Sequence, residues 1–528
     1  MRFSARHGVS IALLLAGNAL AVYAQSHDSL ASRVEKIMAR PEFAHSNFGI
    51  EFYDLESGKV LYSVNSEKLF VPASTTKLLT EGAVLAKLGS GYRFHTPIYR
   101  TGPIDKHGTL KGNLILVASG DPNLSNRIQP DGTLAFVDED HSYQGPALPG
   151  DPLAVIKELA EQVKAKGIRK IEGNIYVDAS LLPDGAREGG TDVVMSSIIV
   201  NDNLIDLVGK PGAKVGQPVE LSISPKTSYV HFTNGIKTGT ADSKLAFDAD
   251  DPTTNPDGTL TIALSGNVPL GMKPQTAAVP IPSPTQFATA VLREAIASSG
   301  IQIKAKKGED AVKDFKQFQK FYVAENQVAE HVSPPLSEEV RITLKVSQNL
   351  HAGMGPYLLG LLVAKDGKNP LRAGFKVEHK FLADAQLDLS GASQGDGAGG
   401  DWADLFSPDF MCHYLAYWKT RPDFQFLFNG LPILGKDGTL AKIQTDNPAA
   451  GHVFAKTGTF GSEDKLNSRL MLNGKGLAGY VQTKSGKTLA FAAYVNHTAL
   501  PEEPEISQKI AGQALGEIAA SAYDVSLP

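Results

Sequence analysis

The chain has 528 residues, of which 42% are hydrophobic and 20% are charged. That length exceeds what one typical core supports, so two or three domains are expected. The formal net charge of -5, without any long basic run, argues against a broad nucleic-acid-binding surface.

The first residues have the pattern of a secretory signal. Arg2, Arg6 and His7 precede the apolar run VSIALLLAGNALAV, and small residues frame a cleavage-like site that ends at Ala24. We therefore expect residues 1–24 to be a signal peptide and the mature protein to be periplasmic. The apolar run is too short to span a bilayer comfortably, and we expect no membrane span after its removal.

Residues from about Ser29 to Lys87 predict a helix, a hairpin and a second helix. The hairpin FGIEFYDLESGKVLYSVN turns at Glu-Ser-Gly, and the helix STTKLLTEGAVLAKLG ends at Gly89. From about Tyr92 to Val279, short β-type runs dominate, interrupted by one clear helix in DPLAVIKELAEQVKAKG. Within this stretch, the polar segment from Asn126 to Gly150 is typical of a long surface loop.

Helical patterns return from about Ser283. The segment SEEVRITLKVSQNLHAGMGPYLLGLLVAKDG predicts two helices with a break between them, and two late strands are joined by a KSGK turn. The simplest assembly is an α/β catalytic domain made of residues 25–91 and 283–528. Residues 92–282 would then form a β-rich insert of one or two subdomains.

The single cysteine, Cys412, cannot form an intrachain disulfide. It lies in the apolar helical pattern DFMCHYLAYW, so burial is expected rather than a nucleophilic role. The 13 histidines are scattered without H-E-x-x-H or a similar spacing. We therefore predict neither a metal site nor a cofactor.

A Ser-x-x-Lys motif raises the question of serine catalysis. In PASTTK, Ser74 and Lys77 lie one helical turn apart on the same face. A lysine held there with little water can lose its proton and activate the hydroxyl. The motif alone is weak, since about two copies arise by chance in a chain this long, and SEDK at Ser462 also fits.

The order of further motifs narrows the choice. A serine acyl-transferase site needs Ser-x-x-Lys, then Ser-x-Asn, then Lys-Thr-Gly along the chain. KTGT occurs twice, beginning at Lys237 and at Lys456, but no Ser-x-Asn lies between Ser74 and Lys237. The first KTGT therefore cannot complete the set, and a strand-to-turn transition is the expected structure there.

Three Ser-x-Asn copies begin at Ser63, Ser265 and Ser347. Two of them precede the second KTGT in the required order. SGN ends a strand of the insert, whereas SQN lies where two helical patterns meet, a natural place for a loop over a cleft. We therefore favour Ser347 and Asn349.

In these surroundings the chain resembles the D-alanyl-D-alanine carboxypeptidase/endopeptidase family, the low-molecular-mass class C penicillin-binding proteins of bacterial cell envelopes. The resemblance covers nearly the whole mature chain. It is carried by PASTTKLLT, LKGNLILVASGDPNL, IEGNIYVDASLL, VNDNLIDL, VSQNLHA, LPILGKDGTLAKI, AKTGTF and LAGYVQTKSGKTLAFAAYVN. It implies an α/β fold of the penicillin-recognising, β-lactamase-like type, with an antiparallel sheet, flanking helices and a large insert.

The resemblance also implies roles for individual residues. Ser74 would be the nucleophile that forms an acyl-enzyme, and Lys77 its general base. Ser347 would pass a proton to the leaving D-alanine, and Asn349 would orient the substrate amide. The second KTGT would hold the terminal carboxylate and, through a backbone N–H, the oxyanion; its residues are catalytic Lys456 and substrate-binding Thr457, Gly458 and Thr459.

Two segments depart from the family pattern. Gly353 and Met354 follow NLHA where a glutamate is common, and DGAGGDW replaces the usual DGSGLSR. Three aspartates of the insert lie in family-like motifs, and capping or turn formation is the expected role for each: Asp121, Asp202 and Asp206.

These observations predict a periplasmic serine D-Ala-D-Ala carboxypeptidase/endopeptidase that acts on peptidoglycan stem peptides and cross-links. A non-catalytic peptidoglycan-binding homologue and a β-lactamase remain as alternatives. Peptidoglycan peptides are the expected partners and β-lactams the expected covalent inhibitors, with no nucleic acid involved. A homodimer is left open.

Overall fold

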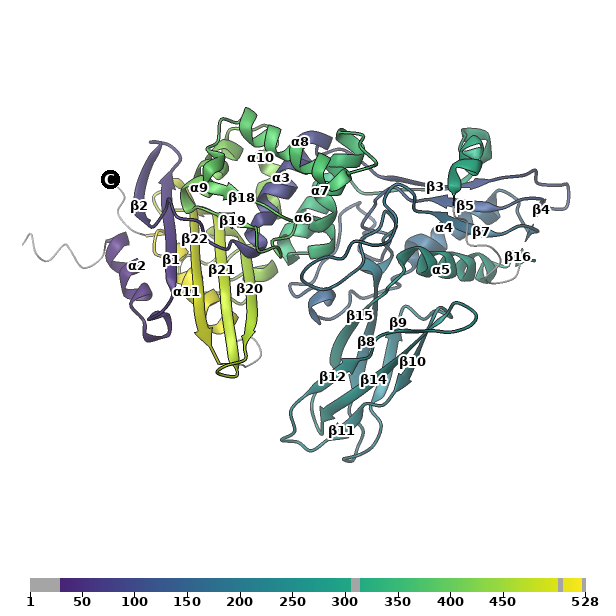
Figure 1. Ribbon diagram of the computed structural model, residues 1–528, viewed down its shortest axis with the longest axis horizontal. Coiled ribbons are helices and arrows are strands. Elements are labelled where there is room, and N and C mark those ends of the chain that lie inside the picture. The colour runs from purple at the N-terminus through teal and green to yellow at the C-terminus, as the bar shows by residue number, and fades with distance from the viewer. Residues whose placement is uncertain (1–28, 305–313, 502–506, 525–528) are drawn as a thin grey trace, which may run out of the picture.

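The computed structural model describes residues 29–304, 314–501 and 507–524. The predicted signal peptide lies outside these ranges. Figure 1 shows an elongated molecule with an α/β body at one end and two further lobes at the other. None of the helices in the described ranges combines the length and the hydrophobicity that crossing a bilayer requires.

An antiparallel five-stranded sheet, built from both ends of the chain, is the centre of the α/β body. In spatial order its strands are β2 (Lys59–Val64), β1 (Asn47–Asp54), β22 (Thr488–Leu500), β21 (Arg469–Gln482) and β20 (Val453–Asp464). The predicted hairpin of β1 and β2 and the predicted pair of β21 and β22 are both present. This sheet and its flanking helices confirm the predicted α/β fold class.

Helices cover both faces of this sheet, because its strands are apolar on both sides. In β22, Phe491 and Val495 face one core, whereas Ala492 and Tyr494 face the other, as the alternation of a strand requires. The first core is closed by α2 (Leu30–Met38) and α11 (Gln513–Ala520). The second lies under the helices α3 (Lys77–Leu88), α6 (Leu336–Val346), α7 (Asn349–Leu358), α8 (Pro370–Asp384), α9 (Pro408–Lys419) and α10 (Phe424–Gly430).

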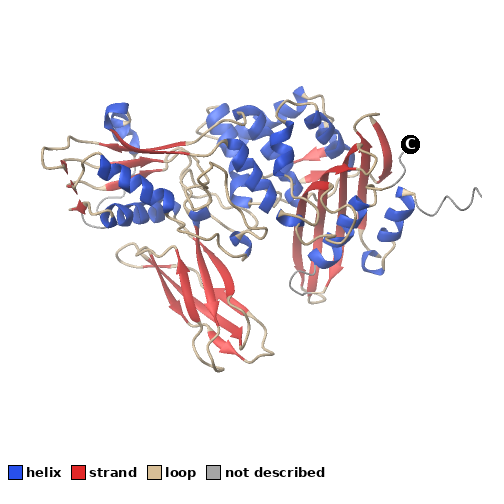
Figure 2. Cartoon of the chain, turned by 180° about the vertical axis from the view of Figure 1, so that it is seen from behind, coloured by secondary structure: helices blue, strands red, loops and turns tan. Residues whose placement is uncertain are grey.

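Figure 2 shows these helices against the sheet from behind. The short pair β18 (Ala392–Ser393) and β19 (Leu405–Phe406) lies beside them. Cys412 is fully buried in α9, as expected. The break between α6 and α7 falls at Ser347 and Gln348, where the sequence predicted it.

The first of the other two lobes is itself α/β. One sheet has the order β17-β3-β5-β7 and a smaller one the order β16-β6-β4. Their strands are β3 (His95–Arg100), β4 (Thr109–Leu110), β5 (Leu114–Val117), β6 (Lys170–Ile171), β7 (Ile175–Asp178), β16 (Gln302–Ile303) and β17 (Gln327–Val332). The helices α4 (Ala154–Ala165) and α5 (Pro284–Ser298) share its core.

This lobe corrects the predicted boundary at residue 282. The prediction placed residues 283–332 in the catalytic domain, but β17 pairs with β3 and β16 pairs with β6. Phe287, Val291 and Leu292 of α5 pack in the same core as Ile156 of α4. Strand pairing and shared packing thus associate this segment with the insert.

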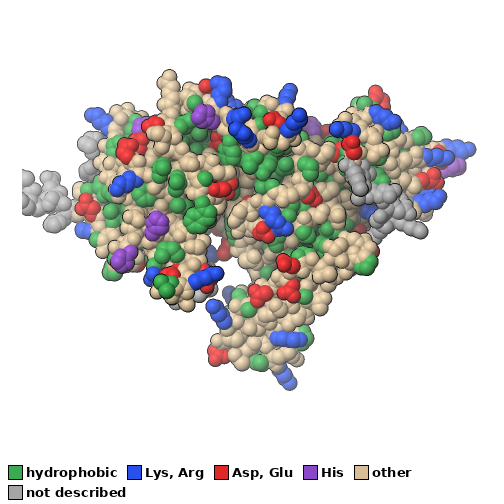
Figure 3. Space-filling model, viewed as in Figure 1, with side chains coloured by type: hydrophobic (Ala, Val, Ile, Leu, Met, Phe, Trp, Pro, Cys, Tyr) green, Lys and Arg blue, Asp and Glu red, His purple; other side chains and the backbone are tan. Residues whose placement is uncertain are grey.

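The second lobe consists of β-strands and lies below the first in Figure 1. Its two sheets have the orders β15-β8-β9 and β10-β14-β11, with β12 and β13 also on β14. The strands are β8 (Leu204–Lys210), β9 (Glu220–Ser224), β10 (Val230–Asn234), β11 (Lys237–Gly239), β12 (Ala246–Ala249), β13 (Thr253–Thr254), β14 (Leu260–Pro269) and β15 (Gln275–Pro280). On the face in Figure 3, Lys and Arg side chains are interspersed with Asp and Glu.

The segment from Asn126 to Gly150 is in part the surface loop that the sequence predicted, since residues 130–133, 138–139 and 146–147 are exposed. Other parts of it are not, because Arg127, Leu134 and Asp140 are buried and residues 141–143 form a short 3-10 helix. Polar composition did not indicate that these side chains find partners inside the protein, between the insert and α6.

Candidate active site

Ser74 and Lys77 lie together at the start of α3. The short 3-10 helix Ala73–Thr76 leads directly into α3, and Lys77 Nζ lies 2.7 Å from Ser74 Oγ. Ala73 has a φ of 47°, a left-handed conformation that is strained for alanine. Such strain is typical of functional sites, and here it sets the backbone immediately before Ser74.

Lys77 is fully buried and has three acceptors for its ammonium group. Its Nζ donates to Ser74 Oγ, to Asn349 Oδ1 at 2.6 Å and to the Ala398 carbonyl at 2.7 Å. Burial lowers the pKa of Lys77 to about 8, against the opposing charge of the nearby Glu188 carboxylate. A substantial fraction of this lysine is therefore neutral near pH 8.

The turn that carries Ser347 and Asn349 joins α6 to α7. Ser347 ends α6 with a φ of 63° and a ψ of 36°, in the left-handed region, and Asn349 is the first residue of α7. This turn points two side chains at two lysines. Asn349 Oδ1 accepts from Lys77, and Ser347 Oγ accepts from Lys456 Nζ at 2.9 Å.

The second KTGT lies in β20, beside the start of α3. A Cβ on Gly458 would come within 2.4 Å of the Pro72 carbonyl oxygen and 2.9 Å of the Ser74 nitrogen. Only glycine lets the strand approach this closely. Lys456 is fully buried, and it also donates to the Thr457 carbonyl at 2.8 Å.

The alternative motif copies lie elsewhere. The first KTGT forms β11 and its end, in the all-β lobe, where it pairs with β14, the strand that contains Ser265. The strand-to-turn interpretation of Lys237–Thr240 is thereby confirmed. Ser63 is in β2, the edge strand of the main sheet, and Ser462 is in the outer part of β20.

A cleft of about 770 Å³ opens beside Ser74. Ser347, Asn349 and the strand segment 457–461 form part of its lining. The insert lines it as well, through residues 138–140, Tyr143 and residues 189–190. A Cβ on Gly190 would lie 2.2 Å from Asn349 Nδ2, so the insert reaches the predicted site residues directly.

The atypical segment Asp396–Trp402 forms a tight loop against the residues around Ser74. Asp396 Oδ1 accepts from the N–H groups of Ala398 and Gly399, and Oδ2 accepts from that of Gly400. These bonds orient the Ala398 carbonyl toward Lys77. A Cβ on Gly399 would lie 2.1 Å from the Ala73 carbonyl oxygen, so the loop packs directly on the backbone that precedes Ser74.

A family model described as the D-Ala-D-Ala carboxypeptidase 3 (S13) family matches residues 30–515. The chain belongs to this S13 family. The predicted family is thereby confirmed, together with the class of enzyme, a serine D-Ala-D-Ala peptidase that acts on peptidoglycan.

Individual relatives agree with this membership. The D-alanyl-D-alanine carboxypeptidase of an Actinomadura species is 26% identical over 525 residues, covering 93% of this chain and 89% of that protein. The penicillin-sensitive carboxypeptidase A of Dictyostelium discoideum is 22% identical over 451 residues, covering 78% of this chain and 76% of that protein.

Solved structures show the same fold. Penicillin-binding protein 4 of Haemophilus influenzae matches with a TM-score of 0.69 and 19% identity, covering 92% of this chain and 97% of that one. Its complex with a β-lactam matches with a TM-score of 0.67 and 20% identity, covering 92% and 98%.

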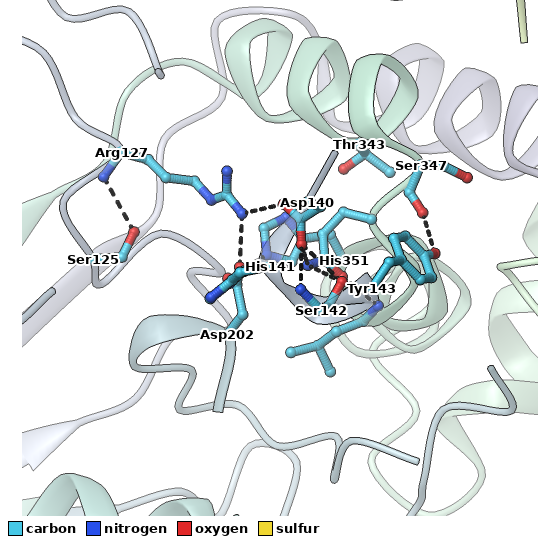
Figure 4. Close-up of polar contacts among 12 residues, drawn as sticks. Ser125, Arg127, Asp140, His141, Ser142, Tyr143, Asp202, Thr343, Ser347 and His351 are labelled. Atoms are coloured by element: carbon cyan, nitrogen blue, oxygen red, sulfur yellow. Dashed lines mark hydrogen bonds and ion pairs between the residues drawn. The ribbon is translucent and has the colours of Figure 1, made fainter. Parts of the chain in front are cut away.

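In this S13 enzyme, a buried polar network from the insert lies behind the Ser347 turn, and the sequence did not predict it. Tyr143 donates its hydroxyl hydrogen to the Ser347 carbonyl at 2.7 Å, as Figure 4 shows. Gln348 Nε2 donates to Asp140 Oδ1 at 3.1 Å. The insert thus holds the backbone of the turn, through residues of which Asp140 and Tyr143 also line the cleft.

Arg127 is the central cation of this network. Its Nη2 lies 2.7 Å from Asp140 Oδ2 and 2.8 Å from Asp202 Oδ2, and all three side chains are buried (Figure 4). Asp202 also accepts from His141 Nε2 at 2.8 Å and from His351 Nε2 at 2.9 Å. Asp202 does lie in a turn, with a φ of 52°, but its side chain forms ion pairs instead of the predicted cap.

Asp206 and Glu339 complete the network at its two ends. Asp206 Oδ1 lies 2.7 Å from His141 Nδ1, so its predicted role as a capping residue is wrong. Glu339 Oε1 lies 2.8 Å from His351 Nδ1. The two histidines each lie between two carboxylates, and these anions raise both histidine pKa values to about 10 despite burial. Asp121 does accept a turn bond from the Asn123 N–H at 2.9 Å, as predicted.

Proposed function

We propose that the protein is an exported periplasmic D-Ala-D-Ala carboxypeptidase/endopeptidase that works through an acyl-enzyme on Ser74. It would release the terminal D-alanine of peptidoglycan stem peptides and cleave the D-Ala cross-links between them. β-Lactams would acylate the same serine. Residues 1–24 would direct export as a signal peptide.

The observation that carries this proposal is the set of partners around Lys77. A neutral lysine has two N–H donors and one lone pair. With Asn349 Oδ1 and the Ala398 carbonyl as acceptors for the two donors, the lone pair is left to accept the proton of Ser74 Oγ. Lys77 would in this way serve as the general base, and a preserved arrangement of this kind disfavours a purely non-catalytic binding protein.

The reaction would follow in two steps. Ser74 Oγ, giving its proton to Lys77, would attack the carbonyl of the penultimate D-alanine, and the oxyanion would be held by the N–H groups of Ser74 and Thr459. The proton taken by Lys77 would be passed through Ser347, which is hydrogen-bonded to Lys456, to the leaving amine as the peptide bond breaks, so that Lys77 is neutral again. Water would then attack the ester and give one proton to Lys77, which would return it to Ser74 Oγ as the shortened peptide leaves as a carboxylic acid.

Purified monomeric and cross-linked muropeptides test this function directly. Incubation of the mature protein with each, followed by mass measurement, is expected to show loss of one D-alanine from pentapeptides and separation of cross-linked dimers. A fluorescent penicillin is expected to label the protein covalently. Intact muropeptides together with an unlabelled protein would contradict the proposal, and rapid nitrocefin hydrolysis without D-alanine release would instead indicate a β-lactamase.

The rate of acylation is expected to rise with pH. Because burial lowers the pKa of Lys77 to about 8, the neutral and active form increases as the pH rises through about 8 and is complete above it. Glu81 faces Lys77 and has its own pKa raised to about 8 by burial, so the observed midpoint belongs to the pair. The measurement is kcat/KM between pH 6 and 9.5 with a peptide amidated at its C-terminus.

An amidated peptide is used because a free carboxylate could bind to a lysine that itself titrates in this range, and its binding would then also change with pH. The histidines of the buried network remain protonated over most of this range, since their pKa values are near 10. A rate that stays constant from pH 6 to 9.5, or that falls on raising the pH through 8, would contradict Lys77 as the base.

A further inference from the structure

Lys475 is a buried lysine in the strand next to the second KTGT. It belongs to β21 and stands directly opposite Thr459 in the pairing of β20 with β21. Its side chain is 3% exposed, and the strand around it is otherwise small or apolar, with Gly474, Gly476 and Leu477 as neighbours. Burying an ammonium group is costly unless an anion accompanies it.

Among the residues that the structure describes, the ammonium of Lys475 has only neutral acceptors. Its Nζ donates to Thr459 Oγ1 at 2.6 Å and to Gln508 Oε1 at 3.1 Å. Within the part of the chain that the structure describes, no carboxylate forms an ion pair with it, so one N–H remains to be used. Burial lowers the pKa of Lys475 to about 8, and a bound anion would offset that desolvation.

Lys475 also lines the cleft beside Ser74, together with Thr457 and Thr459. The two other buried lysines of the site do not line the cleft. Lys77 has three acceptors, and Lys456 donates to two neutral acceptors, Ser347 Oγ and the Thr457 carbonyl. Of these three buried lysines, Lys475 is the one whose side chain lines the cleft, so it is better placed for a substrate carboxylate than the Lys456 that the resemblance had implied.

We propose that Lys475, with Thr459, binds the carboxylate of the residue that leaves during the reaction, and so selects peptides in which that carboxylate is free. This inference rests on the proposed function. The terminal D-alanine of a stem peptide has such a carboxylate, and so has the amino acid that follows D-alanine in a cross-link unless it is amidated. Amidation would replace the anion by a group that a buried ammonium cannot bind well.

Two peptides that differ only at the C-terminus test the proposal, one ending in D-Ala-D-Ala and one in D-Ala-D-alaninamide. Lys475→Met is expected to lower kcat/KM for the free acid by about 10- to 100-fold, the range for a lost hydrogen bond to a charged group. The amide is expected to change by less than about threefold. Lys475→Arg is expected to retain most of the activity on the acid, because it keeps the charge.

Lys484→Met is the matched control, since Lys484 is an exposed lysine in the turn that follows β21. It should leave both peptides unaffected. Equal losses of Lys475→Met on the acid and the amide would assign Lys475 a structural role and overturn the proposal. If Lys475→Met preferred the acid over the amide as strongly as the wild type does, the proposal would be overturned as well.

A wrong proposed function would give a different result from a wrong role of Lys475. The wild-type protein would then release no D-alanine and would not be labelled by penicillin. Even then, calorimetric binding of the two peptides to Ser74→Ala tests Lys475. The acid is expected to bind more tightly than the amide, and a second substitution, Lys475→Met, is expected to remove the difference. Equal binding of acid and amide to Ser74→Ala would overturn the inference.

Discussion

Lys77→Met is expected to slow covalent labelling by a fluorescent penicillin by about 10²–10⁴-fold, the usual contribution of a general base. Methionine fills a similar volume but cannot accept the proton of Ser74 Oγ, and it leaves Asn349 Oδ1 and the Ala398 carbonyl without their donor. The measurement is the second-order labelling rate on intact protein, followed over a range of penicillin concentrations.

Two companion variants make this result interpretable. Ser74→Ala should give no labelling at all, because the atom that forms the ester is gone. Lys380→Met should label like the wild type, since Lys380 lies on the exposed side of α8 in an ion pair with Asp384. Labelling of Lys77→Met at the wild-type rate would show that another group takes the proton, and labelling of Ser74→Ala would remove Ser74 from the mechanism.

Arg127→Met is expected to lower the free energy of unfolding by about 3–5 kcal/mol, the cost of leaving buried carboxylates without their cation. Arg127 is 2% exposed and pairs with both Asp140 and Asp202. Because the same network supports the Ser347 turn through Gln348 and Tyr143, the penicillin-labelling rate should fall as well. Urea denaturation and the labelling rate are the two measurements.

Lys380→Met also serves here as a control. Its ion pair with Asp384 is exposed, so its loss should cost about 0–1 kcal/mol. A loss below about 1 kcal/mol in Arg127→Met would mean that Asp140 and Asp202 are protonated or hydrated at little cost, contrary to the role given to the network. Asp202→Asn, which removes one carboxylate instead of the cation, distinguishes loss of charge balance from loss of packing.

The order of motifs along the chain was enough to select the residues that the structure brings together. Ser74, Lys77 and Asn349 form one set of contacts, and Ser347 and Lys456 form a second, and both sets meet at the turn between α6 and α7. The duplicated KTGT was informative because the required order excluded one copy. No propensity argument would have made that choice.

Other parts of the site depend on tertiary contacts that sequence patterns do not encode. Asp202 looks like any turn aspartate until Arg127 and His351, from separate segments, pack against it. The polar segment from Asn126 to Gly150 was assigned to the surface for the same reason. Some of its hydrophilic residues, such as Arg127 and Asp140, pair with one another inside the protein while others are exposed, and composition cannot distinguish the two.

Lys475 did leave a signal in the sequence, a lone lysine within the small and apolar run NGKGLAGYV. Its partner could not be read from the sequence, because the pairing of β20 with β21 is irregular: Phe460 pairs with Gly474 and Gly461 pairs with Leu472, so Asn473 of β21 is an extra residue. The predicted domain boundary at residue 282 was wrong for a related reason. An amphipathic helix such as α5 shows which of its faces is buried, but not which lobe buries it.

The pairing of β1 with β22 has a consequence for how the enzyme matures. Strand β22 (Thr488–Leu500) lies between β1 and β21 in the sheet, although it is the last of the five strands to be synthesised. A nascent chain can complete its inserted lobes first, since domains fold as units during synthesis. The sheet beneath Ser74 can close only when nearly the whole polypeptide is present, so a chain that ends before Thr488 lacks the strand that joins β1 to β21.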